Sequence, residues 1–273
     1  MLKQRLLTAA ILIPIVVLSI LLLPSTLFQL VLALVTILAG WEWFSIIGYT
    51  TTKKKAIALL SLAVVASAMA LLSPIIILIS SLLVWGLILA LVQIFAHKPL
   101  SLTVQNVFMN KALALLMAVI VLALFWHGAV YLHASSPAGS QQLLYVMVLV
   151  WLADTGGYFA GKRWGKTPLA KAISPNKTWQ GVAGALVLGG IWSVVASFLP
   201  LSSSIPLLTW LLLSLVALFV SIIGDLFESL FKRCYKVKDS GNLLPGHGGI
   251  LDRIDSLIAA IPVFAAGLYF LGA

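Results

Sequence analysis

The chain has 273 residues, of which 62% are hydrophobic and only 9% are charged, and its mean hydropathy is +1.15. A soluble domain has about 25% charged residues, so this composition excludes a soluble globular fold, a disordered chain and a secreted disulfide scaffold. Strands of an outer-membrane barrel alternate polar and apolar residues, and this chain does not. The composition therefore predicts an all-α polytopic membrane protein.

Nine apolar segments are long enough to cross a bilayer as helices, which takes about 20 residues each. The first is interpreted as a membrane span rather than a signal peptide, because its apolar run is too long and no cleavage site follows it. In chain order the segments cover residues 6–23, 27–47, 56–72, 75–96, 112–133, 141–161, 178–199, 205–230 and 250–271.

All seventeen basic residues fall at the N-terminus, in alternate loops, or at the start of the last span. The opposite loops carry no charge, and the positive-inside rule then places the N-terminus in the cytoplasm and the C-terminus on the opposite side. The net charge of +10 thus reports topology, and nucleic-acid binding is not predicted. The basic residues are Lys3, Arg5, Lys53, Lys54, Lys55, Lys98, Lys111, Lys162, Arg163, Lys166, Lys171, Lys177, Lys232, Arg233, Lys236, Lys238 and Arg253.

The two halves of the chain differ in their acidic residues. Residues 1–140, with about five helices, contain only Glu42 and are interpreted as a transmembrane scaffold. Residues 141–273, with about four helices, contain the other six acids and two basic loops, and are interpreted as the catalytic region. The sequence suggests no role for Glu42.

Carboxylates inside membrane spans cost about 2.5–3.5 kcal/mol each and usually face the interior of a helix bundle. Because clustered carboxylates repel one another, a divalent cation would stabilise them, and an all-oxygen ligand set favours Mg²⁺. Buried ion pairs with Lys232, Arg233 and Arg253 are the alternative interpretation. The acids concerned are Asp154, Asp225, Glu228, Asp252 and Asp255.

Two loops have features that suit phosphate binding. Ser174, Lys177 and Thr178 precede a helix start, where hydroxyl, ammonium and backbone N–H donors bind anions. The alternative is that these residues only cap the helix and that the lysine only follows the positive-inside rule. The segment 238–253 is rich in glycine, which lets backbone N–H groups approach an anion closely. It contains no P-loop motif.

These residues resemble the signature of the phosphatidate cytidylyltransferase, or CDP-diacylglycerol synthase, family. Asn176 stands where many members have lysine. The matching positions are Ser229, Lys232-Arg233, Lys238-Asp239, Gly241, Leu244-Pro245, His247-Gly248-Gly249, Ile250, Asp252-Arg253 and Asp255, with a second block of Asp154, Tyr158, Gly161, Gly165, Ser174-Pro175, Lys177-Thr178 and Gly181.

The resemblance implies a reaction of phospholipid biosynthesis, in which CTP and phosphatidic acid give CDP-diacylglycerol and pyrophosphate with Mg²⁺. We expect Asp225, Asp252 and Asp255 to bind the metal, with a second metal ion left open. Lys232, Arg233 and Arg253 would neutralise phosphates. Asp225, Lys232, Asp252, Arg253 and Asp255 form the expected catalytic set. The expected substrate-binding residues are Asp154, Ser174, Lys177, Thr178, Ser229, Arg233, Lys238, Asp239, His247, Gly248 and Gly249.

The compact chain suggests, by analogy, a bacterial inner membrane with the active site facing the cytoplasm, and a homodimer is left open. Two rival functions remain at this stage. One is a CTP-dependent polyprenol or phytol kinase, or another lipid cytidylyltransferase. The other is an anionic-lipid transporter, although a carrier would be expected to place polar groups through the whole membrane depth.

Overall fold

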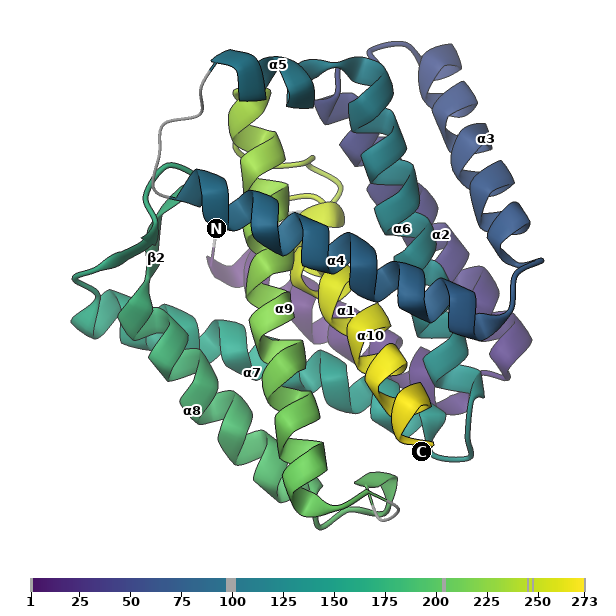
Figure 1. Ribbon diagram of the computed structural model, residues 1–273, viewed down its shortest axis with the longest axis vertical. Helices are drawn as coiled ribbons and strands as arrows, with labels where there is room; N and C mark the ends of the chain where they lie inside the picture. The colour runs from purple at the N-terminus through teal and green to yellow at the C-terminus, as the bar shows by residue number, and fades with distance from the viewer. Residues whose placement is uncertain (1, 97–101, 203–204, 245, 247, 273) are drawn as a thin grey trace.

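The computed structural model describes residues 2–96, 102–202, 205–244, 246 and 248–272. Within these residues, nine long helices occupy the nine segments predicted as spans (Figure 1). They are α1 (Leu2–Leu22), α2 (Ser25–Ile46), α3 (Thr52–Met69), α4 (Pro74–Ala96), α6 (Lys111–Ala134), α7 (Gly139–Trp164), α8 (Trp179–Ala196), α9 (Leu207–Cys234) and α10 (Leu251–Leu271).

Seven of these helices, α2, α4 and α6 to α10, are long and apolar enough to cross a membrane. The apolar stretch found in α1, Thr8–Leu22, is shorter, and α3 has three lysines among its 18 residues. The class of all-α polytopic membrane protein is confirmed. The number of nine spans and their orientation stay predictions.

Short elements that the hydropathy pattern did not predict connect the helices. They are α5 (Leu102–Met109), a 3₁₀ turn at Pro200–Ser202, and an antiparallel hairpin of β1 (Pro168–Ala170) and β2 (Ser174–Thr178). Proline is tolerated at the start of a strand and on an edge strand, which suits Pro168 and Pro175. The hairpin is attached to two helices, since Ala172 N–H donates to the Ala96 carbonyl at the end of α4 and the Arg233 side chain of α9 donates to the Ile173 carbonyl.

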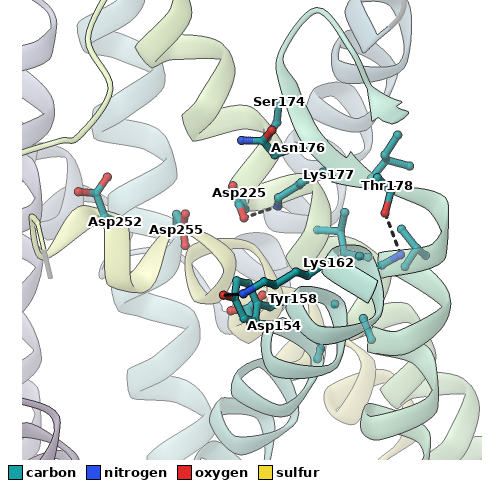
Figure 2. Close-up of a pocket in the computed structure, with 18 of the residues that line it drawn as sticks. Asp154, Tyr158, Lys162, Ser174, Asn176, Lys177, Thr178, Asp225, Asp252 and Asp255 are labelled. Carbon is teal, nitrogen blue, oxygen red and sulfur yellow. Dashed lines mark hydrogen bonds and ion pairs between the residues drawn. The ribbon is translucent and has the colours of Figure 1, made fainter. Parts of the chain in front are cut away.

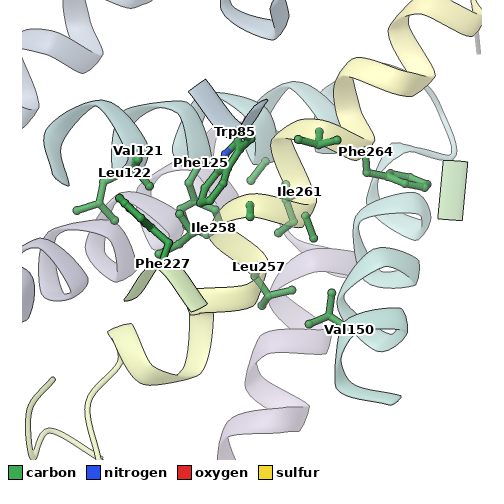
Figure 3. Packing of buried hydrophobic residues seen from close by; sticks show 14 of the residues in the cluster. Trp85, Val121, Leu122, Phe125, Val150, Phe227, Leu257, Ile258, Ile261 and Phe264 are labelled. Carbon is green, nitrogen blue, oxygen red and sulfur yellow. The ribbon is translucent and has the colours of Figure 1, made fainter. Parts of the chain in front are cut away.

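Helix α10 is the central helix of the bundle. Every residue from 256 to 266 is buried, and a helix that is apolar all round belongs inside a protein. Figure 3 shows Trp85 of α4, Phe125 of α6 and Phe227 of α9 packed around its side chains Ile258 and Ile261. The first turn of α10, which carries Asp252 and Arg253, directly precedes this buried stretch.

Glycines let α7 and α8 approach closely. A Cβ atom on Gly156 of α7 would lie 2.4 Å from the Gly184 carbonyl oxygen of α8, so a larger residue there would force the helices apart. Gly157 and Gly161 of α7 also contact this region of α8, although the closest approach is at the neighbouring Gly156. Figure 1 shows α7 and α8 side by side. Their close packing holds the end of β2 beside α7.

Candidate active site

A cavity of 850 Å³ lies where α7, β2, α8, the C-terminal half of α9 and the first turn of α10 meet (Figure 2). These elements are far apart in the sequence, and each contributes at least one polar or glycine residue. Ten of the predicted site residues line the cavity: Asp154, Ser174, Lys177, Thr178, Asp225, Lys232, Asp239, Asp252, Arg253 and Asp255.

Five aspartates line this cavity, and three of them come from three different helices. Asp154 comes from α7, Asp225 from α9 and Asp255 from α10 (Figure 2). The last two are brought together by Gly224, because the backbone of α9 there approaches the Asp255 carbonyl so closely that a Cβ would lie 2.5 Å from it. Like charges so arranged repel one another, and they favour a positively charged partner in the cavity.

Lys177 supplies one such positive charge. It forms an ion pair with Asp225 across the cavity, and the Ser229 hydroxyl donates to the other oxygen of the same carboxylate at 3.3 Å. Burial is the largest single influence and would lower the pKa of Lys177, but the charge and hydrogen bond of Asp225, together with the charges of Asp255 and Asp154, outweigh it and raise the pKa above its ordinary value. Lys177 is therefore a cation at neutral pH.

The start of α8 is arranged by Thr178. Its hydroxyl accepts a hydrogen bond from Gly181 N–H at 3.1 Å, so Thr178 is the N-cap and the helix begins at Trp179, one residue later than predicted. The N-cap interpretation of this residue is confirmed. Thr178 also lines the cavity.

Asp252 accepts several hydrogen bonds from the chain itself. Lys232 Nζ lies 2.9 Å from Oδ1, Ser240 N–H donates to both oxygens, and Gly249 N–H donates to Oδ2 at 2.9 Å. Lys232 also lies 2.5 Å from the buried Glu228. The ion-pair interpretation therefore holds for Lys232, whereas Arg233 and Arg253 form no ion pair within the described residues.

The remaining predicted residues that the structure describes lie outside the cavity lining. Ser229 and Arg233 support it through the contacts described above, Lys238 is exposed, and His247 lies outside the described residues. Gly248 and Gly249 hold the loop against Asp252. Gly248 has a positive φ of 84°, and a Cβ there would meet Asp252 Oδ2 at 2.8 Å, so glycine suits both the backbone and the space.

The sequence analysis did not predict the roles of two charged residues, Lys162 and Glu42. Lys162 lines the cavity, and its ammonium lies 3.4 Å from the Tyr158 hydroxyl. The signal was present, because Asp154, Tyr158 and Lys162 recur every four residues and so share one face of a helix. The other is Glu42, the single acid of the first half, which contacts the loop before α10.

No three His, Cys, Asp or Glu side chains form a ready metal cage anywhere in the described parts of the chain. Mg²⁺ is commonly held by one or two carboxylates together with waters and substrate phosphates. Asp225 and Asp255 are the carboxylates that could serve in this way, since both face the cavity from adjacent helices.

Comparison with known proteins identifies the family. The profile of the cytidylyltransferase family matches residues 3–271. This chain belongs to that family. A phosphatidate cytidylyltransferase of Pseudomonas aeruginosa is 40% identical over all of this chain and 98% of its own length. A phosphatidate cytidylyltransferase of Haemophilus influenzae is 37% identical over 99% of both chains. Another, from Bacillus subtilis, is 42% identical over 57% of this chain and 56% of its own length.

The resemblance noted from the motifs is confirmed, and the protein is a nucleotidyltransferase. A membrane-embedded cytidylyltransferase brings a nucleotide and a lipid together. The cavity suits both substrates, because charged groups line it together with the aromatic side chain of Tyr158, which is 60% exposed. Aromatic side chains of this kind are enriched at the level of lipid headgroups.

Proposed function

We propose that this cytidylyltransferase transfers the cytidylyl group of CTP to phosphatidic acid, giving CDP-diacylglycerol and pyrophosphate. The observation that carries the proposal is the cavity in which five aspartates meet Lys177, Lys162, Lys232 and Arg253. The basic side chains suit phosphate groups, and the carboxylates suit a divalent cation that binds together with substrate phosphates. The full-length similarity to phosphatidate cytidylyltransferases supports the choice of substrates.

In the proposed reaction, an oxygen of the lipid phosphate attacks the α-phosphorus of CTP. A new P–O bond forms to the lipid, and the bond from the α-phosphorus to the leaving pyrophosphate breaks. The attacking phosphate is already anionic, so no protein nucleophile is required. Such transfers depend mainly on positioning and on neutralising charge.

The basic residues of the cavity would position the two substrates and neutralise their phosphates. Arg253 has no carboxylate partner within the described residues, and its guanidinium suits bidentate phosphate binding. Lys177 is a cation beside Asp225, from which it can reach the same phosphates. Ser174 lies on the same strand and adds a hydroxyl donor. Together they would hold the triphosphate and lipid phosphate for in-line attack.

Bound Mg²⁺ would supply neutralisation of the triphosphate oxygens. Asp225 and Asp255 are the residues we expect to hold it, with Asp154 nearby as a further ligand or an orienting group. Asp252 stays a predicted ligand, but its hydrogen bonds to Ser240 and Gly249 favour a role in fixing the loop. A second metal ion stays a prediction.

We further propose that the cavity faces the cytoplasm of a bacterial inner membrane. All basic residues lie at the N-terminus, in alternate loops or at the start of the last predicted span, as the positive-inside rule requires, and the similar proteins are bacterial. The described residues that line the cavity belong to one chain, and the homodimer stays open.

An assay in detergent micelles tests the proposal. It uses phosphatidic acid, Mg²⁺ and CTP that is labelled at the α-phosphate in one sample and at the γ-phosphate in another. Label from the α-phosphate in the lipid product, with pyrophosphate release, is the expected result. Label in the lipid only from the γ-phosphate would show a CTP-dependent lipid kinase instead. Flux of phosphatidic acid across proteoliposomes without CTP would show a transporter.

A further inference from the structure

Glu42 lies in the last turn of α2, within the half of the chain that provides no residue of the cavity lining. Its side chain is only 3% exposed. A buried carboxylate is costly unless hydrogen bonds and favourable charges compensate for its lost hydration. The neighbours of Glu42 therefore indicate what the residue does.

One oxygen of Glu42 joins α2 to the segment between α9 and α10. Oε2 accepts hydrogen bonds from the Ser240 hydroxyl at 3.0 Å and from Leu251 N–H at 2.9 Å. Leu251 is the first residue of α10, where a negative charge is stabilised by the free N–H groups and the helix dipole. Glu42 is thus an acidic cap supplied to α10 by a distant helix.

Two glycines make room for this carboxylate. A Cβ on Gly249 would lie 2.3 Å from Glu42 Oε2, and a Cβ on Gly241 would lie 2.5 Å from Oε1. Any larger residue at either position would collide with the glutamate. The loop is therefore shaped around Glu42, which explains glycines that a phosphate-binding role alone would not require at these two positions.

Ser240 extends the contact into the cavity. While its hydroxyl donates to Glu42, its backbone N–H donates to both oxygens of Asp252, at 3.1 and 3.0 Å. Asp252 in turn accepts from Lys232 at 2.9 Å. A continuous series of hydrogen bonds and ion pairs therefore runs from α2 to two side chains that line the cavity.

We propose that Glu42 is a positioning residue, which fixes the loop before α10 through Ser240 and thereby sets the placement of Asp252 and Lys232. The inference rests on the proposed function for its kinetic consequence, but its structural consequence is independent of the substrate. A carboxylate on the scaffold half then controls turnover without touching a substrate. Displacement of reacting groups by about 1 Å can reduce turnover about 100-fold.

The test uses the full-length protein in detergent with Glu42→Ala, Glu42→Gln and Ser240→Ala. Thr36→Val is the matched control, because Thr36 is buried in the same helix and its hydroxyl donates only to the Leu32 carbonyl of α2. Two measurements are made on each purified variant. One is hydrogen–deuterium exchange of the peptides that carry Ser240 and Leu251, and the other is kcat and KM for CTP.

We expect Glu42→Ala to increase exchange in these peptides and to lower kcat per folded molecule by about 100-fold. Glu42→Gln, which keeps one acceptor oxygen, should restore part of the kcat, and Thr36→Val should match wild type in both measurements. Ser240→Ala should lower kcat while α10 keeps its cap. If Glu42→Ala does not fold, the glutamine and Ser240→Ala variants decide the matter by the same measurements.

Wild-type exchange rates in Glu42→Ala, or an unchanged kcat in a folded variant whose loop exchanges faster, would overturn the inference. Unchanged exchange and kcat in both Ser240→Ala and Glu42→Gln would do so as well. Absence of CDP-diacylglycerol formation by the wild-type protein would instead refute the proposed function. The exchange measurements would still report on the contact made by Glu42.

Discussion

Replacing Gly224 by alanine tests whether the close approach of α9 and α10 sets the geometry of the cavity. The added Cβ would lie 2.5 Å from the Asp255 carbonyl oxygen and 2.9 Å from Ala259 Cβ. Non-bonded heavy atoms normally stand at about 3.5 Å or more, so the two helices must separate by about 1 Å. Asp225 is the next residue after Gly224 in α9, and Asp255 is the residue of α10 that the added Cβ would contact. The two carboxylates would therefore move apart.

Two magnitudes follow from this displacement. Overpacking of a buried contact costs about 1–3 kcal/mol of stability, which lowers the melting temperature but leaves a folded protein. Misplacement of reacting groups by about 1 Å lowers turnover by about 100-fold. We therefore expect Gly224→Ala to lose activity far more than it loses folded enzyme.

The assay is the initial rate of pyrophosphate release from CTP and phosphatidic acid in micelles, with the melting temperature measured on the same sample. Gly190→Ala is the matched control, since Gly190 lies inside α8 with no heavy atom within 4 Å of the added Cβ. Alanine in a helix interior is favoured over glycine by about 1 kcal/mol. A folded Gly224→Ala protein that turned over as fast as this control would refute the reasoning.

Three further predictions concern individual groups in the cavity. Asp225→Asn should reduce turnover by about 100-fold or more while the protein elutes and melts as a folded species; near-normal turnover would show that Asp225 does not hold the metal. Lys162→Ala should raise the KM for phosphatidic acid about 10-fold, the effect of losing about 1.4 kcal/mol, whereas the exposed Lys171→Ala should not; equal values would exclude a lipid-phosphate contact. Removal of divalent cations by EDTA should abolish turnover, which added Mg²⁺ restores, and activity that persists in EDTA would remove the metal from the proposal.

Much of the architecture could be predicted because membrane insertion constrains the sequence directly. A span needs about 20 apolar residues, so the positions of nine long helices follow from hydropathy, to within a few residues at each end. Charged residues are excluded from most of the membrane depth, so the few acids that remain indicate the functional end of the bundle. Asp154, Asp225, Asp252 and Asp255 were found in this way, and all four line one cavity.

The partners of these acids could not be predicted from spacing. Periodicity reports which residues share a face of one helix, and it gives no information on which helix packs against that face. Asp225 pairs with Lys177 from a hairpin strand, and Asp252 is held by Ser240 and Gly249 of the loop before its own helix. The hairpin itself was missed because its strands are only three and five residues long.

Glu42 shows most clearly what tertiary structure added. The sequence isolated it as the single acid of the first 140 residues, but its two hydrogen-bond partners lie 198 and 209 residues further along the chain. The sequence by itself determined the membrane class, the helices and the scarce charges, because each follows from the cost of placing local groups in lipid. The packing of helices distant in the sequence decided which charges meet, since that depends on close contacts such as Gly224 with Asp255 and Glu42 with Gly249.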